Sequence, residues 1–389
     1  MEVFFTFLKL GMISFGGPIA HIGYFRAEFV GRRGWLSDSQ FGQLLAICQF
    51  LPGPASSQLG FCIGLLRAGW LGALSAFLAF TLPSALLLIA FAAALPMLSG
   101  PMGAAAIHGL KLVACAVVAD AVLGMSKTLC PDTPRKTIAF FALAALLSMS
   151  SAIVQLIVVV LAALAGVLFL GNISIPGNET KIQISLGPRV GGILLLLFAA
   201  LLIGLPIFSS PSPTLESVAG VFYRAGALVF GGGHVVLPLL QDSVVATGWM
   251  TPDQFLAGYG GAQAIPGPMF AFSAYLGSVL SQGNATWLMA ATALIFMFLP
   301  GFLLVTGVLP LWRAVSHNPA AGRAIAGVNA AVVGLLGAAL YNPIFLSGIT
   351  VSSDLAIAVV AFGLLAIGRL TPIAVVAWCV VACIARLWF

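Results

Sequence analysis

Charged residues are what this sequence has least of. Only 7% of its 389 residues are Asp, Glu, Lys or Arg, whereas 61% are hydrophobic and the mean hydropathy is +1.14. A water-soluble fold needs far more charge to cover its surface, so that class is excluded. Sixteen basic against ten acidic residues give a net charge of +6. In an apolar chain this excess indicates basic cytoplasmic loops and an anionic partner rather than nucleic acid.

The sequence also lacks the signatures of enzymes. It has no Gly-x-Ser-x-Gly, no His-Glu-x-x-His, no Walker A motif and no run of paired acidic residues. We therefore expect no catalytic residues, no metal and no cofactor, and an ATP-driven pump is disfavoured. The cysteines are expected to be small buried side chains because they lie mostly inside apolar runs. They are Cys48, Cys62, Cys115, Cys130, Cys379 and Cys383.

Long apolar runs make up most of the chain. A helix needs roughly 20 residues to cross the hydrocarbon core, whereas barrel strands alternate over about 10 residues. The runs here fit helices, so the predicted fold class is all-α, a polytopic membrane protein of about 12–13 segments. We expect no cleavable signal peptide, because Met1 leads directly into an apolar segment without a basic start.

A Gly/Pro motif occurs twice. Gly16-Gly17-Pro18 is followed by Pro52-Gly53-Pro54 in the first half, and Gly231-Gly232-Gly233 is followed by Pro266-Gly267-Pro268 in the second. Pro removes a donor and kinks a helix, and Gly loosens it, so each motif should break a membrane helix and free backbone groups. Such groups are tolerated in a membrane only where protein or a water-filled cavity satisfies them. Matched breaks in two halves point to the binding site of a transporter.

The two halves match in register, at an offset of 215 residues around Gly16 and 214 residues around Pro52. This indicates an internal duplication. The predicted domains are an N-terminal membrane repeat (1–170), a linker with one connecting membrane segment (171–217) and a C-terminal membrane repeat (218–389). An odd connecting segment would invert one half, and equivalent loops do carry opposite charge character. The basic loops are Lys127, Arg135 and Lys136 in the first half and Arg313, His317 and Arg323 in the second.

One group of arginines does not fit this topology. Arg26, Arg32 and Arg33 fall on the side opposite the other basic loops if every segment crosses fully. Two interpretations stay open: the broken segments do not all cross, or these arginines are retained for an anion.

The broken helices are the candidate site. The N-terminus of a helix presents free amides and roughly half a positive charge, so four such ends suit an anion. The candidate substrate-binding residues are Gly16, Gly17, Pro18, His21, Arg26, Gln49, Pro52, Gly53, Pro54 and Gln58 in the first half and Gly231, Gly232, Gly233, His234, Gln263, Pro266, Gly267 and Pro268 in the second.

The polar candidates beside the breaks each have a structural alternative. Gln49 and Gln263 precede Pro-Gly-Pro by three residues, and bonding to the broken backbone is as good an interpretation as ligand contact. Gln58 has a Phe as its counterpart, so its role should be one-sided. His21 and His234 are packed hydrogen-bond donors or proton-dependent ligands.

Charged and amide residues inside apolar segments form a second group of candidates. Arg26 and Arg224 can hold an oxyanion bidentately. Anchoring at the membrane interface is the alternative, and for Arg224 it is the stronger interpretation. Lys111 and Asp120 lie about 13.5 Å apart along one helix, too far for a direct pair. A central membrane charge costs about 2.5–3.5 kcal/mol, so each is a functional candidate. Asn329 stands at the place of Lys111 in the second repeat.

The sequence resembles the chromate ion transporter family, in its long two-domain form. The first copy of the pattern is Phe15-Gly16-Gly17-Pro18, His21, Arg26, Trp35, Leu51-Pro52-Gly53-Pro54 and Gln58. The second copy is Phe230-Gly231-Gly232-Gly233-His234, Trp249, Ile265-Pro266-Gly267-Pro268 and Gly327 to Gly334. Gly233 departs from the pattern because the first copy has Pro18 there.

The resemblance implies a secondary transporter that exports chromate across the bacterial inner (plasma) membrane, driven by the membrane potential or a proton gradient, and that confers chromate resistance. Sulfate or another oxyanion stays an alternative substrate, since chromate and sulfate are both tetrahedral dianions. A membrane enzyme acting on a phosphate-bearing lipid is a weaker alternative, because no nucleophile or base is visible. The expected partners are the oxyanion and membrane lipid, without nucleic acid, and a homodimer stays open.

Overall fold

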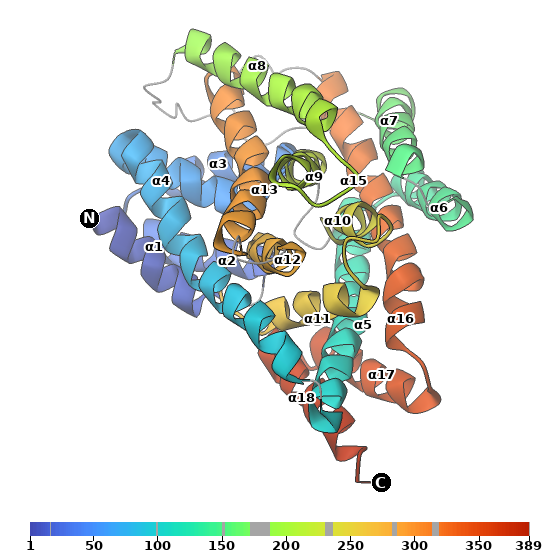
Figure 1. Cartoon of the computed structure of the whole chain (residues 1–389). Coiled ribbons are helices and arrows are strands. Elements are labelled where there is room, and N and C mark those ends of the chain that lie inside the picture. Colours follow the sequence, from blue (N-terminus) through green and yellow to red (C-terminus); the bar gives the residue numbers. More distant parts are fainter. Residues whose placement is uncertain are drawn as a thin grey trace.

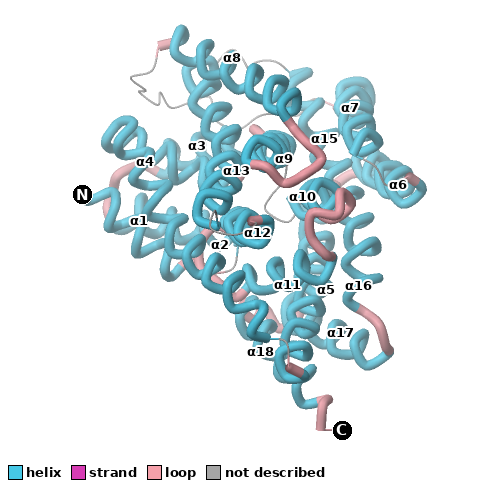
Figure 2. The backbone as a smooth tube through the Cα atoms, viewed as in Figure 1, coloured by secondary structure: helices cyan, strands magenta, loops and turns pink. Residues whose placement is uncertain are grey.

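A computed structural model of the chain describes residues 1–15, 17–98, 100–149, 152–171, 187–229, 236–281, 286–312 and 319–388. Within these ranges every regular element is helical, and Figure 2 shows helices joined by short loops with no strand. The predicted all-α class is thereby confirmed. Gly16, Gly231, Gly232, Gly233 and His234 fall outside the described residues.

The first half contains two short broken helices followed by longer ones. Its elements are α1 (Glu2–Ile13), α2 (Gly17–Phe25), the π-helix η1 (Arg26–Arg32), α3 (Asp38–Phe50), α4 (Ala55–Ala94), η2 (Leu95–Leu98), α5 (Pro101–Leu129), α6 (Thr133–Ser148) and α7 (Ala152–Phe169). Helix α4 is really two helices, because Ala68 and Gly69 leave helical backbone angles and Gly69 has a positive φ.

The connecting helix α8 (Pro188–Gly204) runs along the outside of the bundle (Figure 1). Together with η3 (Leu205–Phe208) it leads into the second half. That half comprises α9 (Leu215–Leu228), α10 (Val236–Val244), α11 (Pro252–Gln263), η5 (Met269–Ala271), α12 (Phe272–Leu280), α13 (Thr286–Val308), η6 (Leu309–Leu311), α15 (Pro319–Ala339), η7 (Leu340–Phe345), α16 (Leu346–Gly348), α17 (Ser352–Ala366) and α18 (Pro372–Ala385).

The two halves repeat element by element. Helices α3 and α11 begin with the same capping box. The side chain of Ser37 or Thr251 accepts from the backbone N–H of the Gln three residues on, and the side chain of that Gln accepts from the backbone N–H of Ser37 or Thr251. The repeat offset falls from 215 to 214 between the first break and α3, so the first half holds one extra residue there. The π-helix η1 occupies that stretch, and a π-bulge is how a helix absorbs one inserted residue.

The halves exchange helices. Helix α5 of the first half packs on α17 and α18 of the second, and α15 of the second packs on α6 and α7 of the first. Glycines allow the close approach: a Cβ on Gly109 of α5 would lie 2.9 Å from the Cys379 carbonyl oxygen, and one on Gly327 of α15 would lie 2.1 Å from the Ala162 carbonyl oxygen. The two repeats are therefore one interlocked body rather than two separate bundles. All six cysteines are buried, as expected.

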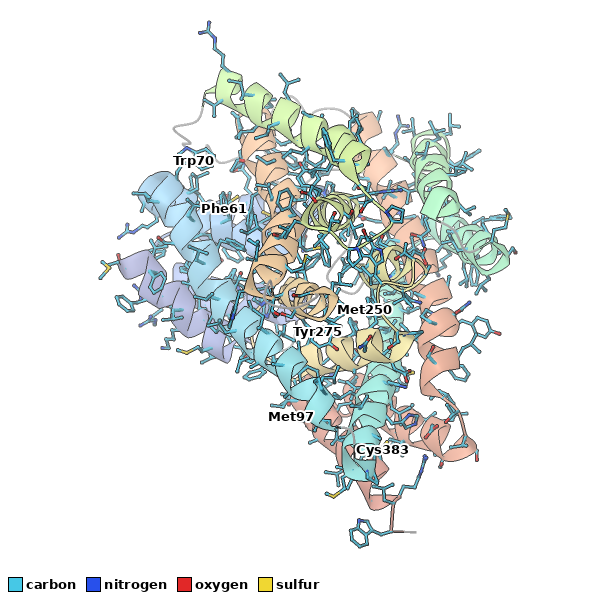
Figure 3. The ribbon with its side chains drawn as sticks, in the orientation of Figure 1. Phe61, Trp70, Met97, Met250, Tyr275 and Cys383 are labelled. Atoms are coloured by element: carbon cyan, nitrogen blue, oxygen red, sulfur yellow. The ribbon has the colours of Figure 1, made fainter. Side chains whose placement is uncertain are left out.

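One pair of equivalent helices does not pack equivalently. Helix α11 lies against α5, whereas α3 shows no comparable packing on α15. The sequences explain the difference: α11 carries Gly258-Tyr259-Gly260-Gly261 where α3 has Leu44-Leu45-Ala46-Ile47. A Cβ on Gly260 would lie 2.2 Å from the Leu110 carbonyl oxygen, so only glycine lets α11 come this close. Tyr275, labelled in Figure 3, supports α11 by donating from its hydroxyl to the Gln254 carbonyl oxygen at 2.7 Å.

Among the described helices, five are long and apolar enough to cross a membrane by themselves. They are 55–98, 101–129, 188–208, 286–311 and 319–348, and shorter apolar helices follow at 157–169, 269–280, 352–366 and 372–385. The broken helices are each about half a membrane long at 1.5 Å per residue. Fewer long spans are found than the 12–13 segments predicted because many of the apolar segments are broken into short helices.

Acidic partners hold the arginines that did not fit the predicted topology. Arg32 and Arg33 both bond Glu28, and the Arg33 guanidinium also reaches Glu2 at 2.8 Å. The hydrogen bond from Arg32 lowers the pKa of the Glu28 carboxyl to about 2 against the opposing effect of burial, with Arg33 adding to it. Arg26 bonds Asp38 at 2.9 Å. Structural pairing thus accounts for these arginines without an anion.

Candidate functional site

Two equivalent backbone hydrogen bonds join each Pro-Gly-Pro turn to the end of the first helix of the other half. The Gly53 N–H donates to the Val229 carbonyl oxygen at 2.7 Å, and the Gly267 N–H donates to the Ser14 carbonyl oxygen at 2.9 Å. Gly53 and Gly267 differ by the repeat offset of 214, and Ser14 and Val229 by 215. Each Pro-Gly-Pro turn therefore satisfies the end of the first helix in the opposite half. We call the residues around these two bonds the break junction: Ser14, Gly17, His21, 52–54, Val229 and 266–268.

The glycines of the break junction adopt backbone angles that other residues avoid. Gly17, Gly53 and Gly267 have φ of 74°, 123° and 98°. Such values are open to glycine because it has no Cβ. The turns thereby point their N–H groups across to the other half instead of along a helix.

The two turns satisfy their proline carbonyls differently. In the first half, the Gln58 amide donates to the Pro52 carbonyl oxygen at 3.0 Å and to the Gly301 carbonyl oxygen at 2.9 Å. In the second half, the Ser84 hydroxyl donates to the Pro266 carbonyl oxygen at 2.7 Å. Gln58 thus bonds broken backbone, the role that the sequence offered as an alternative for Gln49 and Gln263.

His21 is buried at the junction, with 1% of its surface exposed. Its Nε2 lies 3.2 Å from the Ser14 carbonyl oxygen and its Nδ1 lies 3.4 Å from the Ser56 hydroxyl. A carbonyl oxygen only accepts, so Nε2 carries the proton, and a neutral ring then accepts from Ser56 at Nδ1. The edge of the ring packs on Phe80, with centroids 5.4 Å apart. His21 therefore fixes the end of α1 to the start of α4.

Several buried polar atoms near the breaks have no hydrogen-bond partner among the described residues. They are the Ser14, Ser57 and Thr81 hydroxyl oxygens, the Gln58 Oε1 and the Gln263 Nε2. Buried polar atoms are almost always bonded, so unpartnered ones indicate a bound molecule or water. The hydroxyls and the Gln263 amide are donors that an oxyanion accepts from. The start of α4 at Ala55 adds the positive end of a helix.

The other polar candidates are exposed or paired with acidic residues. Gln49 is exposed although its counterpart Gln263 is 9% exposed. The Arg26 side chain is 63% exposed and paired with Asp38. The Lys111 ammonium on α5 bonds the Asp253 carboxylate at 2.6 Å.

The remaining charge and amide candidates lie on three helices. Asp120 is half-buried on α5 and Arg224 is exposed on α9. Asn329 on α15 has an Oδ1 that is buried without a partner in the part of the chain that is described.

Sequence reasoning missed several of these residues. Ser84 directly follows Pro83, and the matching Pro300 is followed by Gly301. This difference between the two Leu-Pro motifs was a signal that could have found Ser84. Asp242 and Asp253 are two of only ten acidic residues in the chain. That scarcity was a usable signal, because an acid in an apolar chain needs a partner.

Comparison with known proteins matches this architecture. A family model described as "Chromate transporter" covers residues 1–167 and 217–384, one region in each half. The chain belongs to the chromate transporter family. It is thus a multi-pass membrane transporter and not an enzyme, as its sequence predicted.

Curated relatives cover most of the chain. It is 31% identical over 339 residues (86% of this chain, 82% of the relative) to a probable chromate transport protein of Synechococcus elongatus. It is 31% identical over 353 residues (87% and 79%) to a chromate transport protein of Pseudomonas aeruginosa. An uncharacterized transporter of Methanocaldococcus jannaschii is 25% identical over 343 residues (86% and 82%). No solved structure shows a significant match to this chain.

Proposed function

We propose that this chain is a secondary transporter that exports chromate, a tetrahedral oxyanion, across the bacterial inner membrane and so confers resistance to chromate. The observation that carries the proposal is the break junction, where each Pro-Gly-Pro turn bonds the end of a broken helix in the other half and Ser14 keeps a buried hydroxyl without a partner among the described residues. The relatives named as chromate transport proteins support the choice of anion.

The break junction offers an oxyanion hydrogen bonds without offering it a full charge. The Ser14 hydroxyl in the junction, and the Gln263 amide and the Ser57 and Thr81 hydroxyls outside it, are donors without a partner among the described residues. Neutral donors and helix ends hold an anion while leaving it free to depart, which a transporter needs. His21 with a proton on both nitrogens would become a further donor, at the cost of its bond from Ser56.

The unequal packing of the halves suggests how access alternates. Helix α11 is closed against α5 while α3 is not comparably packed on α15. In a transporter built from inverted repeats, the opposite state exchanges the conformations of the two repeats. We therefore propose that α3 closes as α11 opens, with the two reciprocal backbone bonds as the pivot.

Uptake into inverted membrane vesicles tests the proposal. Vesicles with the protein should accumulate labelled chromate above empty vesicles, and Gln263→Leu should reduce uptake about tenfold if it removes one hydrogen bond worth about 1.4 kcal/mol. Thr128→Val, at an exposed position of α5, is the control for expression and insertion. Sulfate and molybdate in parallel, under separately imposed pH and voltage gradients, identify the substrate and the driving force. No accumulation of any of the three anions would refute transport of oxyanions.

The arginine prediction has its own test. If Arg26 attracts the anion, Arg26→Ala should slow chromate efflux from cells at equal expression. An exposed ion pair contributes only about 0–1 kcal/mol to stability, so the variant should fold. Efflux at the wild-type rate would remove Arg26 from the site.

A further inference from the structure

A pocket outside the break junction is lined by an arginine, an aspartate and two neutral polar residues. Residues from α7, α9, α10 and α15 line it, and Figure 1 shows these helices grouped on one side of the bundle. Its polar members are Gln155 on α7, Arg224 on α9, and Asp242 and Ser243 on α10. A second pocket adjoins it and shares Gln155 and Asp242. The two together form one polar recess in an otherwise apolar wall.

Asp242 is half-buried in this recess without a cation. The Gln155 side-chain amide, which is buried, donates to the Asp242 carboxylate. Among the described residues, Asp242 forms no ion pair within 4 Å, and neither does Arg224, although both line the same pocket. A buried carboxylate held only by a neutral amide is costly to keep ionised. Its repeat counterpart at an offset of 214, Glu28, is by contrast held ionised by two arginines.

Among the described residues, few charged or titratable groups line the pocket with Asp242. Helix α9 contributes Arg224, the neighbouring π-helix η7 contributes Tyr341 to the adjoining pocket, and the lining residues of α7 and α15 carry no charge. The Ser243 hydroxyl donates to the Leu239 carbonyl oxygen at 2.7 Å, so its hydrogen is already used. Of the pocket's described lining residues, Arg224 is thus the group that can attract an anion, and Asp242 is the group that repels one.

We propose that this pocket binds an oxyanion together with a proton, with Arg224 holding the anion and Asp242 the proton. A proton from the aqueous side adds to the Asp242 carboxylate, which becomes a neutral carboxylic acid. The repulsion between the carboxylate and a dianion ends, and the acid gains an O–H donor for it. The Gln155 amide, released from the carboxylate, becomes a second donor. The forked guanidinium of Arg224 then meets a tetrahedral oxyanion without competition.

This proposal rests on oxyanion transport and deepens it, because it supplies a place where the proton and the anion are bound together. It also makes the two repeats unequal in function. The first half pairs its acid and arginines with each other, whereas the second leaves both accessible in one pocket. A single pocket of this kind is enough to link one proton to each transport cycle.

Equilibrium dialysis of the purified protein with labelled chromate, at pH 6.5 and pH 8.5, tests the pocket independently of transport. Wild-type affinity should rise at the lower pH. Asp242→Asn should lose the part of the pH dependence that comes from the protein. Protonation of the free chromate affects all variants alike, and the pH dependence of Glu216→Gln, in which Asp242 is intact, provides the comparison. Arg224→Ala should weaken binding about tenfold or more at both. Glu216 is exposed on the same helix α9 and serves as the matched control.

Gln155→Leu gives a second measurement should Asp242→Asn fold poorly. It removes a hydrogen bond to the ionised carboxylate, so Asp242 should bind its proton at a higher pH. The pH at which chromate affinity changes should shift upward as well. Unchanged pH dependence in Asp242→Asn, or wild-type affinity in Arg224→Ala, overturns the pocket. Wild-type binding without uptake into vesicles would overturn the proposed transport function and leave the pocket standing.

Discussion

The two Pro-Gly-Pro turns use the same backbone bond and different side chains. Gly53 and Gly267 donate to equivalent carbonyls across the repeats, at 2.7 and 2.9 Å. The proline carbonyl of the first turn is satisfied by Gln58, which also reaches Gly301, whereas that of the second is satisfied by Ser84. The backbone symmetry therefore does not extend to the side chains that support it.

This difference locates the part of the junction that is free to bind a ligand. The Gln58 amide nitrogen already donates to two carbonyl oxygens, and its Oε1 can only accept a hydrogen bond. Gln263 in the second half keeps its buried amide without a partner among the described residues. The donors for an anion are therefore not the same in the two halves. The repeated motif alone would predict a symmetric site with both Gln49 and Gln263, whereas the structure buries only Gln263 of this pair.

The largest expected effect breaks the shared backbone bond. An Ala at Gly53 or Gly267 would hold a positive φ, which costs a residue with a Cβ about 1–2 kcal/mol. The new Cβ would also lie 2.8 Å from the Gln58 Nε2 and 3.0 Å from the Gly301 Cα in the first case, and 2.0 Å from the Ser84 Oγ in the second. We expect both variants to lose at least about 2 kcal/mol of unfolding free energy. Thermal unfolding in detergent measures it.

A second substitution separates the two turns. Ser84→Ala removes the oxygen that an Ala at position 267 would meet, so it should recover part of the stability of Gly267→Ala. Gln58→Ala should recover less of the stability of Gly53→Ala, because it removes the contact with the Gln58 amide but leaves the backbone contact with Gly301. Equal rescue at both turns, measured by double-mutant cycles, would show that the clash does not decide the cost.

The side-chain supports give the next largest effect. Gln58→Leu leaves the Pro52 and Gly301 carbonyl oxygens without their donor, whereas Ser84→Ala leaves only that of Pro266. Each buried group left unsatisfied costs about 1–3 kcal/mol. Gln58→Leu should therefore destabilise the protein about twice as much in the same unfolding assay. A larger loss in Ser84→Ala would contradict the assignment of Gln58 to both carbonyls.

The sequence predicted the fold class and the pairing of the motifs, because both depend on local rules. Apolar runs of membrane length predict helices, and repeated Gly and Pro predict breaks. It could not predict which half receives the freed N–H of Gly53, because a motif shows that a donor is free and not where it points. The exchange of α5 and α15 between the halves escaped for the same reason.

Charged residues were predictable as unusual, but their partners were not. Lys111 was singled out as a charge within an apolar segment, yet its partner Asp253 comes from the other repeat. Arg26 was singled out for an anion, yet a carboxylate twelve residues on occupies it. A long flexible side chain reaches several neighbours, so tertiary packing decides which one it meets.

The smallest effect concerns the packing of α11 on α5, which the first half does not repeat. The Lys111 side chain is 11% exposed and that of Asp253 is 67% exposed. Asp253→Asn strands a nearly buried ammonium and should cost about 1–2 kcal/mol, whereas Lys111→Met leaves a hydrated carboxylate and should cost less than about 0.5 kcal/mol. Equal losses, measured by unfolding in detergent, would mean that the pair is exchanging with water rather than fastening α11. Unequal losses in the expected order would show that this pair stabilises the packing of α11 on α5.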